Sequence, residues 1–202
     1  ADAYHLYPTD GKVNGLRSNY PYGECANGTT ERPVGEVKAL GKKGKSTFPG
    51  YSDIVFEPDD EYKGDLARSY FYMAAAYNDK IAGWNSDMLA GNDYPAYTSW
   101  AVSLLLKWSR QDPVSTKETD RNEAISAYQQ NRNPFIDHPE LSEYIWGDKT
   151  GTPWYIGAES EPRISTPSDG TVIGIGATSV GITRSRTIYV AGANLEADVK
   201  VN

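Results

Sequence analysis

The composition of the chain changes at Trp154, and this change limits the folds that the sequence can adopt. Before Trp154, apolar residues recur at helical spacing in several segments. After it, helix-forming residues give way to short runs of Ser, Thr, Gly, Val and Ile. We therefore predict an α+β protein with a mainly helical domain at residues 1–157 and a short β tail or partial β-sandwich module at residues 158–202.

The first strong helix signal lies near the middle of the helical domain. Residues 58–61 are a proline followed by three acids, which is typical of a helix start. We interpret Glu57 and Asp60 as helix-start acids rather than as metal ligands. Helical spacing of apolar residues then continues to about residue 78, with one apolar face. Arg68 lies among these apolar residues, so we expect a buried and paired arginine with a structural role.

Three more helices are predicted from their start signals. Thr98 is a capping residue before an apolar face that includes Leu104 and Trp108. Residues 115–118 form a capping box for a helix that reaches about residue 130. Asp137 is placed to cap a short fourth helix.

The predicted strands lie in the tail, at residues 171–175, 187–191 and 198–201. About 45 residues are too few to close a β-sandwich, and a piece of two or three strands is marginally stable. The tail is therefore either the start of a second domain or a segment that packs on the first.

The residues richest in site chemistry lie between Asp2 and Pro21, a stretch with one histidine, two aspartates, two asparagines and one arginine. A turn in this stretch predicts a short helix that holds Asn14 and Arg17 three residues apart, on one face. An amide oxygen can bind a hard cation, and a guanidinium can bind a phosphate oxygen. The stretch fits a metal-assisted phosphate site, and it also fits a capped turn with ordinary polar residues.

Charge and cysteine content narrow the function further. The net charge of −7 argues against a protein that binds nucleic acid through a bulk positive field. The run from Lys38 to Lys45 holds four cations in a Gly-spaced stretch, which is either a patch for a polyanion or a solvated loop. Cys25 is the single cysteine, so no disulfide forms within the chain, and we expect an incidental thiol. No apolar run approaches membrane-spanning length.

Three stretches in this order, at residues 2–21, 56–73 and 129–139, resemble the bacterial endonuclease I family. These are secreted or periplasmic, sequence-nonspecific nucleases with a ββα-metal active site, also called a His-Me finger. The resemblance covers residues 2–146 and implies a metal-dependent endonuclease that hydrolyses DNA, with RNA as a further candidate substrate. The β tail resembles the Ig-like modules that follow such nucleases in some secreted proteins.

The resemblance also implies site residues. In the family a histidine takes a proton from water, and one divalent metal, usually magnesium with manganese or calcium as substitutes, neutralises the scissile phosphate. The metal-binding asparagine of the family's Val-Asn-Gly segment matches Asn14. Arg17, in the same segment, is a candidate for substrate binding. Arg132 is a second candidate, although its Asn-Arg-Asn run also fits a structural role in which amides cap a helix end.

The chain departs from the family pattern at two places. The family's general-base histidine lies upstream of the aspartate that matches Asp2, so we expect an endonuclease I domain without its first β-strands. His5 matches a different position beside the metal-bearing helix. His5 is the candidate catalytic residue within this chain, with packing or a supporting hydrogen bond as the alternative. In the third stretch, Gln130 replaces a glycine of the family.

Two functions therefore remain open. The first is a secreted, monomeric, metal-dependent nuclease that acts on DNA and RNA. The second is a non-catalytic secreted module that binds nucleic acid or another polyanion on a nuclease-like scaffold, which the net charge and the missing base favour. Glycan binding through the many tyrosines has no supporting motif.

Overall fold

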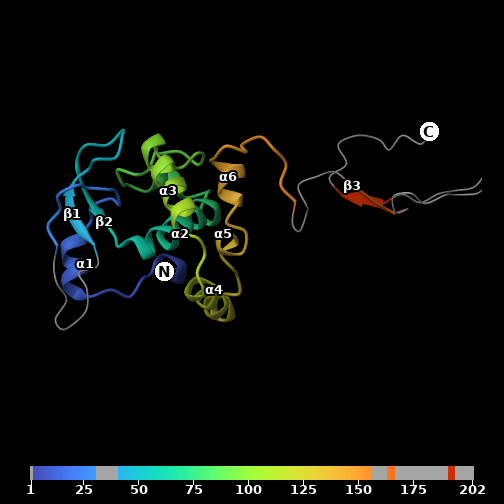
Figure 1. The fold of residues 1–202 in the computed structure, drawn as a ribbon, viewed down its shortest axis with the longest axis horizontal. Coiled ribbons are helices and arrows are strands. Elements are labelled where there is room, and N and C mark those ends of the chain that lie inside the picture. The colour runs from blue at the N-terminus through green and yellow to red at the C-terminus, as the bar shows by residue number, and fades with distance from the viewer. Residues whose placement is uncertain (1, 31–40, 156–162, 167–190, 194–202) are drawn as a thin grey trace, which may run out of the picture. The chain divides into compact units, whose positions relative to one another are not determined.

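The computed structural model of the protein describes residues 2–30, 41–155, 163–166 and 191–193. Contacts divide the chain into two compact units, Ala1–Thr152 and Pro153–Asn202. The first unit combines helices with a small sheet, so the predicted α+β class is confirmed (Figure 1). The assignment of a nuclease domain and a separate module, with a boundary between residues 157 and 158, stays a prediction.

A two-stranded antiparallel sheet lies beside the first α-helix, α1 (Gly11–Arg17) (Figure 1). Strands β1 (Lys42–Lys45) and β2 (Ile54–Glu57) pair so that their outer residues Lys42 and Glu57 face each other. The chain before β1 also reaches β2, because the Phe56 amide donates to the carbonyl of Pro21 at 2.9 Å. Residues 42–45 of the lysine run, which the sequence allowed to be a solvated loop, thus form the strand β1.

Helix α2 (Lys63–Ala76) is the central helix of the first unit. It is buried on nearly all sides rather than on one face as predicted, because other elements surround it (Figure 1). It also begins later than predicted, after the single turn η2 (Asp60–Tyr62). The reason is that Glu57 ends β2, and the side chain of Asp59 caps η2.

The charged residues buried in α2 are paired. Arg68 is fully buried and donates from Nε and Nη2 to the Glu118 carboxylate, at 2.7 and 2.5 Å. Asp65 is also buried and pairs with Lys117 at 2.8 Å. Burial raises the pKa of the Glu118 carboxyl, and the ion pair with Arg68 acts in the opposite direction. The predicted buried and paired state of Arg68 is confirmed.

Helices α3 (Ser99–Gln111) and α4 (Thr116–Gln129) lie where they were predicted. Thr98 precedes α3 as expected, but its side chain makes no capping hydrogen bond, because the hydroxyl donates to the Met88 carbonyl at 3.3 Å instead. The apolar residues of α3 pack against α2 and form much of the core. Ser115 and Glu118 form the predicted capping box at the start of α4, with both reciprocal hydrogen bonds present.

The last helical segment differs from the prediction. It forms two short helices, α5 (Pro134–Asp137) and α6 (Leu141–Ile145), instead of one helix capped by Asp137. The cap is Asn133, whose side-chain oxygen accepts a hydrogen bond from the Phe135 amide at 2.9 Å. Proline suits the first turn that follows this cap, so the helix begins at Pro134.

The second unit contributes one described strand pair, β3 (Arg163–Thr166) and β4 (Ala191–Ala193), which are antiparallel. The sequence did not predict the strand β3. The predicted strands 171–175 and 198–201, and all of 187–191 except residue 191, lie outside the described residues. The Ig-like module therefore stays a prediction.

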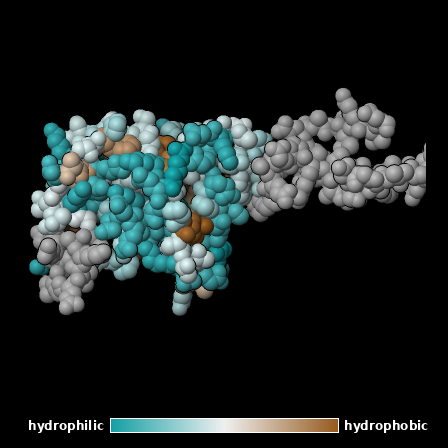
Figure 2. All heavy atoms as spheres, in the orientation of Figure 1, coloured by the Kyte–Doolittle hydropathy of each residue, from teal (hydrophilic) through white to brown (hydrophobic). Residues whose placement is uncertain are grey.

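The face of the first unit drawn in Figure 2 is mostly hydrophilic, with small hydrophobic areas between polar ones. None of the helices in the described part of the chain has both the length and the apolar run needed to cross a membrane.

Candidate functional site

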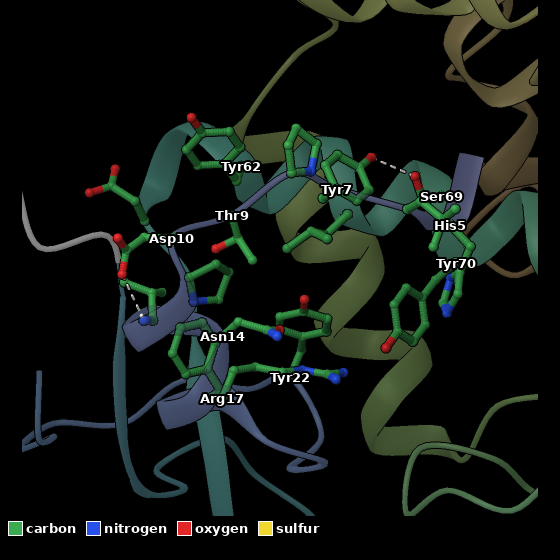
Figure 3. Close-up of a pocket in the computed structure, with 17 residues that line it drawn as sticks. His5, Tyr7, Thr9, Asp10, Asn14, Arg17, Tyr22, Tyr62, Ser69 and Tyr70 are labelled. Atoms are coloured by element: carbon green, nitrogen blue, oxygen red, sulfur yellow. Dashed lines mark hydrogen bonds between the residues drawn. The ribbon is translucent and has the colours of Figure 1, made fainter. Parts of the chain in front are cut away.

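A cavity of about 680 Å³ lies between residues 5–10, helix α1, the end of β2 and helix α2. Three of the four predicted site residues, His5, Asn14 and Arg17, line it. Figure 3 shows Asp10 near one end of the cavity, His5 at the other, and Asn14 and Arg17 on the side of α1 between them. The structure therefore brings these three residues to one place.

Helix α1 positions Asn14 and Arg17 through local interactions. The Asp10 carboxylate accepts hydrogen bonds from the amides of Lys12 and Val13, at 2.8 and 3.2 Å, and so caps the helix. Val13 is buried and anchors the helix against the protein. Asn14 is exposed, and its side chain makes no hydrogen bond to any residue that the structure describes. Its amide oxygen is free to bind a cation.

Arg17 is held without a carboxylate partner. Its Nη1 donates to the Ser18 carbonyl at 3.0 Å, and its guanidinium lies 4.8 Å from the ring centre of Tyr22. No carboxylate of the described residues lies within ion-pair distance of it, and its Nε makes no hydrogen bond there. Arg17 therefore keeps donors for an anion such as a phosphate.

His5 ends the single turn η1 (Ala3–His5), which Asp2 caps by accepting from the Tyr4 amide at 2.9 Å. The residue is exposed, and its ring centre lies 6.0 Å from that of Tyr70. The protein atoms around the ring lower the pKa of His5, and the positive charge of Arg17 lowers it further, while Asp2 acts in the opposite direction. The lowered pKa favours the neutral imidazole, which is the form that can accept a proton.

Arg132, the fourth predicted site residue, lies outside this cavity. Its Nε and Nη2 each donate to the Asp137 carboxylate at 2.8 Å, and Nη1 pairs with Glu123 at 2.5 Å. A neighbouring residue, Asn133, is fully buried and accepts from the Phe135 amide. These contacts favour the structural role of this run, and substrate binding by Arg132 stays a prediction.

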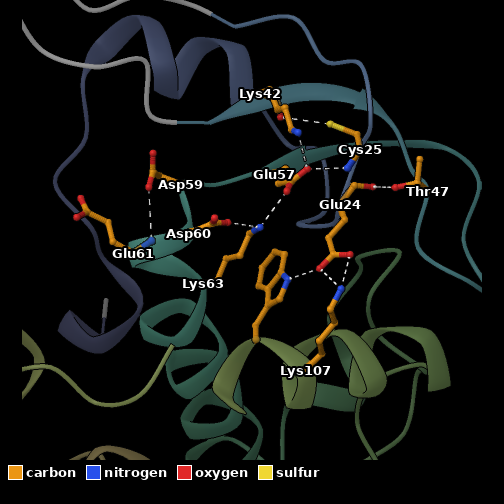
Figure 4. A network of polar contacts seen from close by, with 11 residues as sticks. Glu24, Cys25, Lys42, Thr47, Glu57, Asp59, Asp60, Glu61, Lys63 and Lys107 are labelled. Atoms are coloured by element: carbon orange, nitrogen blue, oxygen red, sulfur yellow. Dashed lines mark hydrogen bonds and ion pairs between the residues drawn. The ribbon is translucent and has the colours of Figure 1, made fainter. Parts of the chain in front are cut away.

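Glu57 and Asp60, read from the sequence as helix-start acids, take part in a lysine network (Figure 4). The Glu57 carboxylate contacts Lys63 at 2.9 Å and accepts from the Cys25 amide at 2.7 Å. Asp60 contacts the same lysine at 2.6 Å. Burial raises the pKa of the Cys25 thiol, and the negative charge of Glu57 adds to this, so Cys25 is not an activated thiolate.

The aromatic wall of the cavity was not predicted. Tyr22 and Tyr70 face each other edge to face, with ring centres 5.9 Å apart, and both line the cavity together with Tyr62. The only signal in the sequence was the high tyrosine content, 15 residues against 4 phenylalanines. That signal says nothing about which tyrosines meet.

The side chains present fit a hard cation held by few protein ligands. The amide of Asn14, which lines the cavity and makes no side-chain hydrogen bond to a described residue, could supply one oxygen ligand. Among the residues that the structure describes, no group of three or more His, Cys, Asp or Glu side chains is placed to hold a metal. Magnesium keeps several waters and often takes substrate phosphates as ligands, whereas zinc in proteins usually has three or four protein ligands. A site with one protein ligand therefore suits magnesium better than it suits zinc.

The fold and the cavity are consistent with one class of protein, an α+β protein that acts on phosphate groups. The cavity brings together an imidazole with a lowered pKa, a guanidinium without a carboxylate partner among the described residues, and an amide that makes no side-chain hydrogen bond there. The sequence profile of the endonuclease I family matches residues 1–140, and the chain belongs to that family. The family resemblance inferred from the sequence is confirmed.

Three similar proteins are named as extracellular or periplasmic nucleases. An extracellular ribonuclease of Bacillus amyloliquefaciens is 43% identical over 148 residues, which cover 72% of this chain and 46% of the relative. An extracellular ribonuclease of Bacillus subtilis (strain 168) is 41% identical over 148 residues, which again cover 72% of this chain and 46% of the relative. A periplasmic deoxyribonuclease of Aeromonas hydrophila is 29% identical over 136 residues, which cover 67% of this chain and 47% of the relative. The chain thus spans about half the length of these relatives.

Proposed function

We propose that this chain forms the body of a metal-dependent, sequence-nonspecific endonuclease that hydrolyses phosphodiester bonds. The observation that carries the proposal is the meeting of Asn14, Arg17 and His5 at one cavity in a chain of the endonuclease I family.

Both DNA and RNA are proposed substrates. The Bacillus relatives are named ribonucleases and the Aeromonas relative is named a deoxyribonuclease, so the family includes both activities. The same names, extracellular and periplasmic, support a secreted or periplasmic protein. We also propose that it acts as a monomer.

Each residue of the cavity has a distinct role in this proposal. Asn14 would hold magnesium through its amide oxygen, and the bound ion would neutralise charge on the scissile phosphate. Arg17 would bind a non-bridging phosphate oxygen with the donors that no carboxylate occupies. His5 is the histidine of the cavity, and its neutral ring would accept a proton or a hydrogen bond from the nucleophilic water.

The test compares the full chain with two variants, on supercoiled plasmid and on single-stranded RNA, with magnesium and with EDTA. We expect cleavage only with magnesium, and a fall of about 100-fold or more in Asn14→Ala, because a lost metal ligand removes several kcal/mol of charge stabilisation. Asn27→Ala is the matched control, since Asn27 is an exposed asparagine that does not line the cavity. Its activity should equal that of the wild type.

Two results would contradict the proposal. Full activity of Asn14→Ala would remove the metal assignment. Binding of nucleic acid that weakens with salt, without cleavage under any condition, would favour the non-catalytic binding module instead.

A further inference from the structure

A second cavity, of about 560 Å³, adjoins the first. His5, Arg17 and Tyr70 line both cavities, so these three side chains form the wall between them. The rest of the second cavity comes from residues 19–21, from the end of α2 and from residues 81–89 after the turn η3 (Ile81–Gly83). A phosphate bound by Arg17 would therefore lie at the border of two hollows.

Arg17 has no carboxylate partner among the residues that the structure describes. Arg68, Arg110 and Arg132 each pair with a carboxylate. Arg121 also lacks a carboxylate partner, but it lies over the Tyr7 ring, donates to two backbone carbonyls and lines neither cavity. The partners of Arg17 are the Tyr22 ring, the Ser18 carbonyl and the hydroxyls of Tyr22 and Tyr70, all of them neutral. The shared wall thus holds an arginine whose positive charge no acid neutralises.

Trp84 gives the second cavity an exposed aromatic surface. It is 40% exposed, which is unusual for the largest apolar side chain, and it lines the cavity. Its position is nevertheless fixed. Its amide donates to the Ile81 carbonyl at 3.0 Å, and its ring centre lies 5.6 Å from that of Tyr77, whose hydroxyl donates to Asp2 at 3.0 Å. A held and exposed indole is a surface for stacking rather than a mobile side chain.

The rim of this cavity is polar. Asn19, Asn85 and Ser86 line it and carry both hydrogen-bond donors and acceptors. A flat aromatic face with amides and a hydroxyl around it suits a heteroaromatic ring with polar edges, which is the chemistry of a nucleobase.

We propose that the second cavity binds an unpaired nucleobase next to the scissile phosphate, with Trp84 as the stacking surface. The proposal rests on the proposed nuclease function and names its preferred substrate as single-stranded nucleic acid. A base in a duplex is already stacked and paired, so it would have to leave the helix to reach Trp84, which costs a few kcal/mol per base. Single strands do not carry this cost.

The test measures binding of the full chain to short phosphorothioate oligonucleotides, which resist cleavage, in magnesium. The single strand and its duplex are compared for the wild type, Trp84→Ala, Trp84→Phe and Tyr128→Ala. Tyr128 is the matched control, because it is 90% exposed on α4 and lines neither cavity. Circular dichroism checks that each variant is folded.

We expect Trp84→Ala to weaken binding of the single strand about 10-fold, the usual size of one base–aromatic stack, and to change duplex binding less than about twofold. Trp84→Phe should recover most of the loss, and Tyr128→Ala should match the wild type. The stacking site would be overturned if Trp84→Ala lost affinity equally for the single strand and the duplex, or if it bound both as Tyr128→Ala does. As long as the wild type binds, either result leaves the proposed nuclease function standing. A wild type that binds neither substrate would overturn both.

Discussion

Arg17 is held by the ring of Tyr22 and not by an acid, and this decides what the side chain can bind. A carboxylate partner would occupy the planar donors of a guanidinium, as Asp137 does for Arg132. An aromatic ring holds the guanidinium through its face and does not neutralise its charge. The same positive charge also acts on His5, which lies in the same wall between the cavities.

The first residue-scale prediction concerns this coupling. Nuclear magnetic resonance titration should place the pKa of His5 below the ordinary value of about 6.5, because the surrounding protein and Arg17 both disfavour the charged ring. In Arg17→Gln the pKa of His5 should rise, because one of the two causes that lower this pKa is removed.

Lys12→Gln is the control for this experiment, because it removes a positive charge from the same helix without touching the cavity. The pKa of His5 in Lys12→Gln should equal that in the wild type. The His5 signal is identified in a His138→Asn background, because His5 and His138 are the two histidines of the chain. An unchanged pKa in Arg17→Gln would show that the two side chains do not interact in solution.

At the scale of elements, the end of α4 explains a departure from the family pattern. Gln130 is the residue that follows the helix, and its backbone is left-handed, with φ of 60° and ψ of 23°. Glycine adopts this conformation without the clash that a side chain causes, which accounts for the glycine of the family at this position. The chain keeps the same helix end with a less suitable residue.

We therefore expect Gln130→Gly to raise the free energy of unfolding by about 1 kcal/mol, because the strain of a left-handed non-glycine residue is removed. Thermal unfolding followed by circular dichroism should show a midpoint roughly 2–4 °C higher. The matched control is Ala124→Gly, at an exposed position inside the same helix, which should lower stability by about 1 kcal/mol. A loss of stability in both variants would mean that the helix does not end in this conformation.

At the scale of the whole molecule, the described core lies within the first unit. The buried cluster and the side chains packed against it run from Tyr4 to Trp146, with α2 and α3 at its centre. Trp146 stacks on Phe71 with ring centres 4.9 Å apart, so α6 is part of this core.

A shortened chain of residues 1–155 should therefore unfold within about 2 °C of the full chain, since it keeps every residue of the described core. A chain of residues 1–140 is the contrast, because it loses Leu141, Ile145 and Trp146 from the edge of the core. Its midpoint should fall by roughly 5–10 °C. A comparable fall for residues 1–155 would show that the β tail packs on the first unit, the alternative left open by the sequence.

The sequence determined the features that depend on neighbours along the chain. Helix α1 follows from a capping aspartate and from helical periodicity, which place Asn14 and Arg17 on one face with no help from distant residues. The capping box of α4 is local in the same way, and both were predicted. Family membership was also readable, because three long motifs occur in order.

Only the tertiary structure decided the features that depend on residues far apart. Glu57 reads as a helix-start acid, yet pairing with Lys42 on β1 makes it the end of a strand. The Asn-Arg-Asn run was read as structural with Arg132 still a candidate substrate contact, and pairing of Arg132 with Asp137 and Glu123 favours the structural role. Trp84 and Arg17, which are 67 residues apart in the sequence, line the same cavity. Such meetings follow from packing of the whole core, and local sequence patterns carry no information about packing between distant segments.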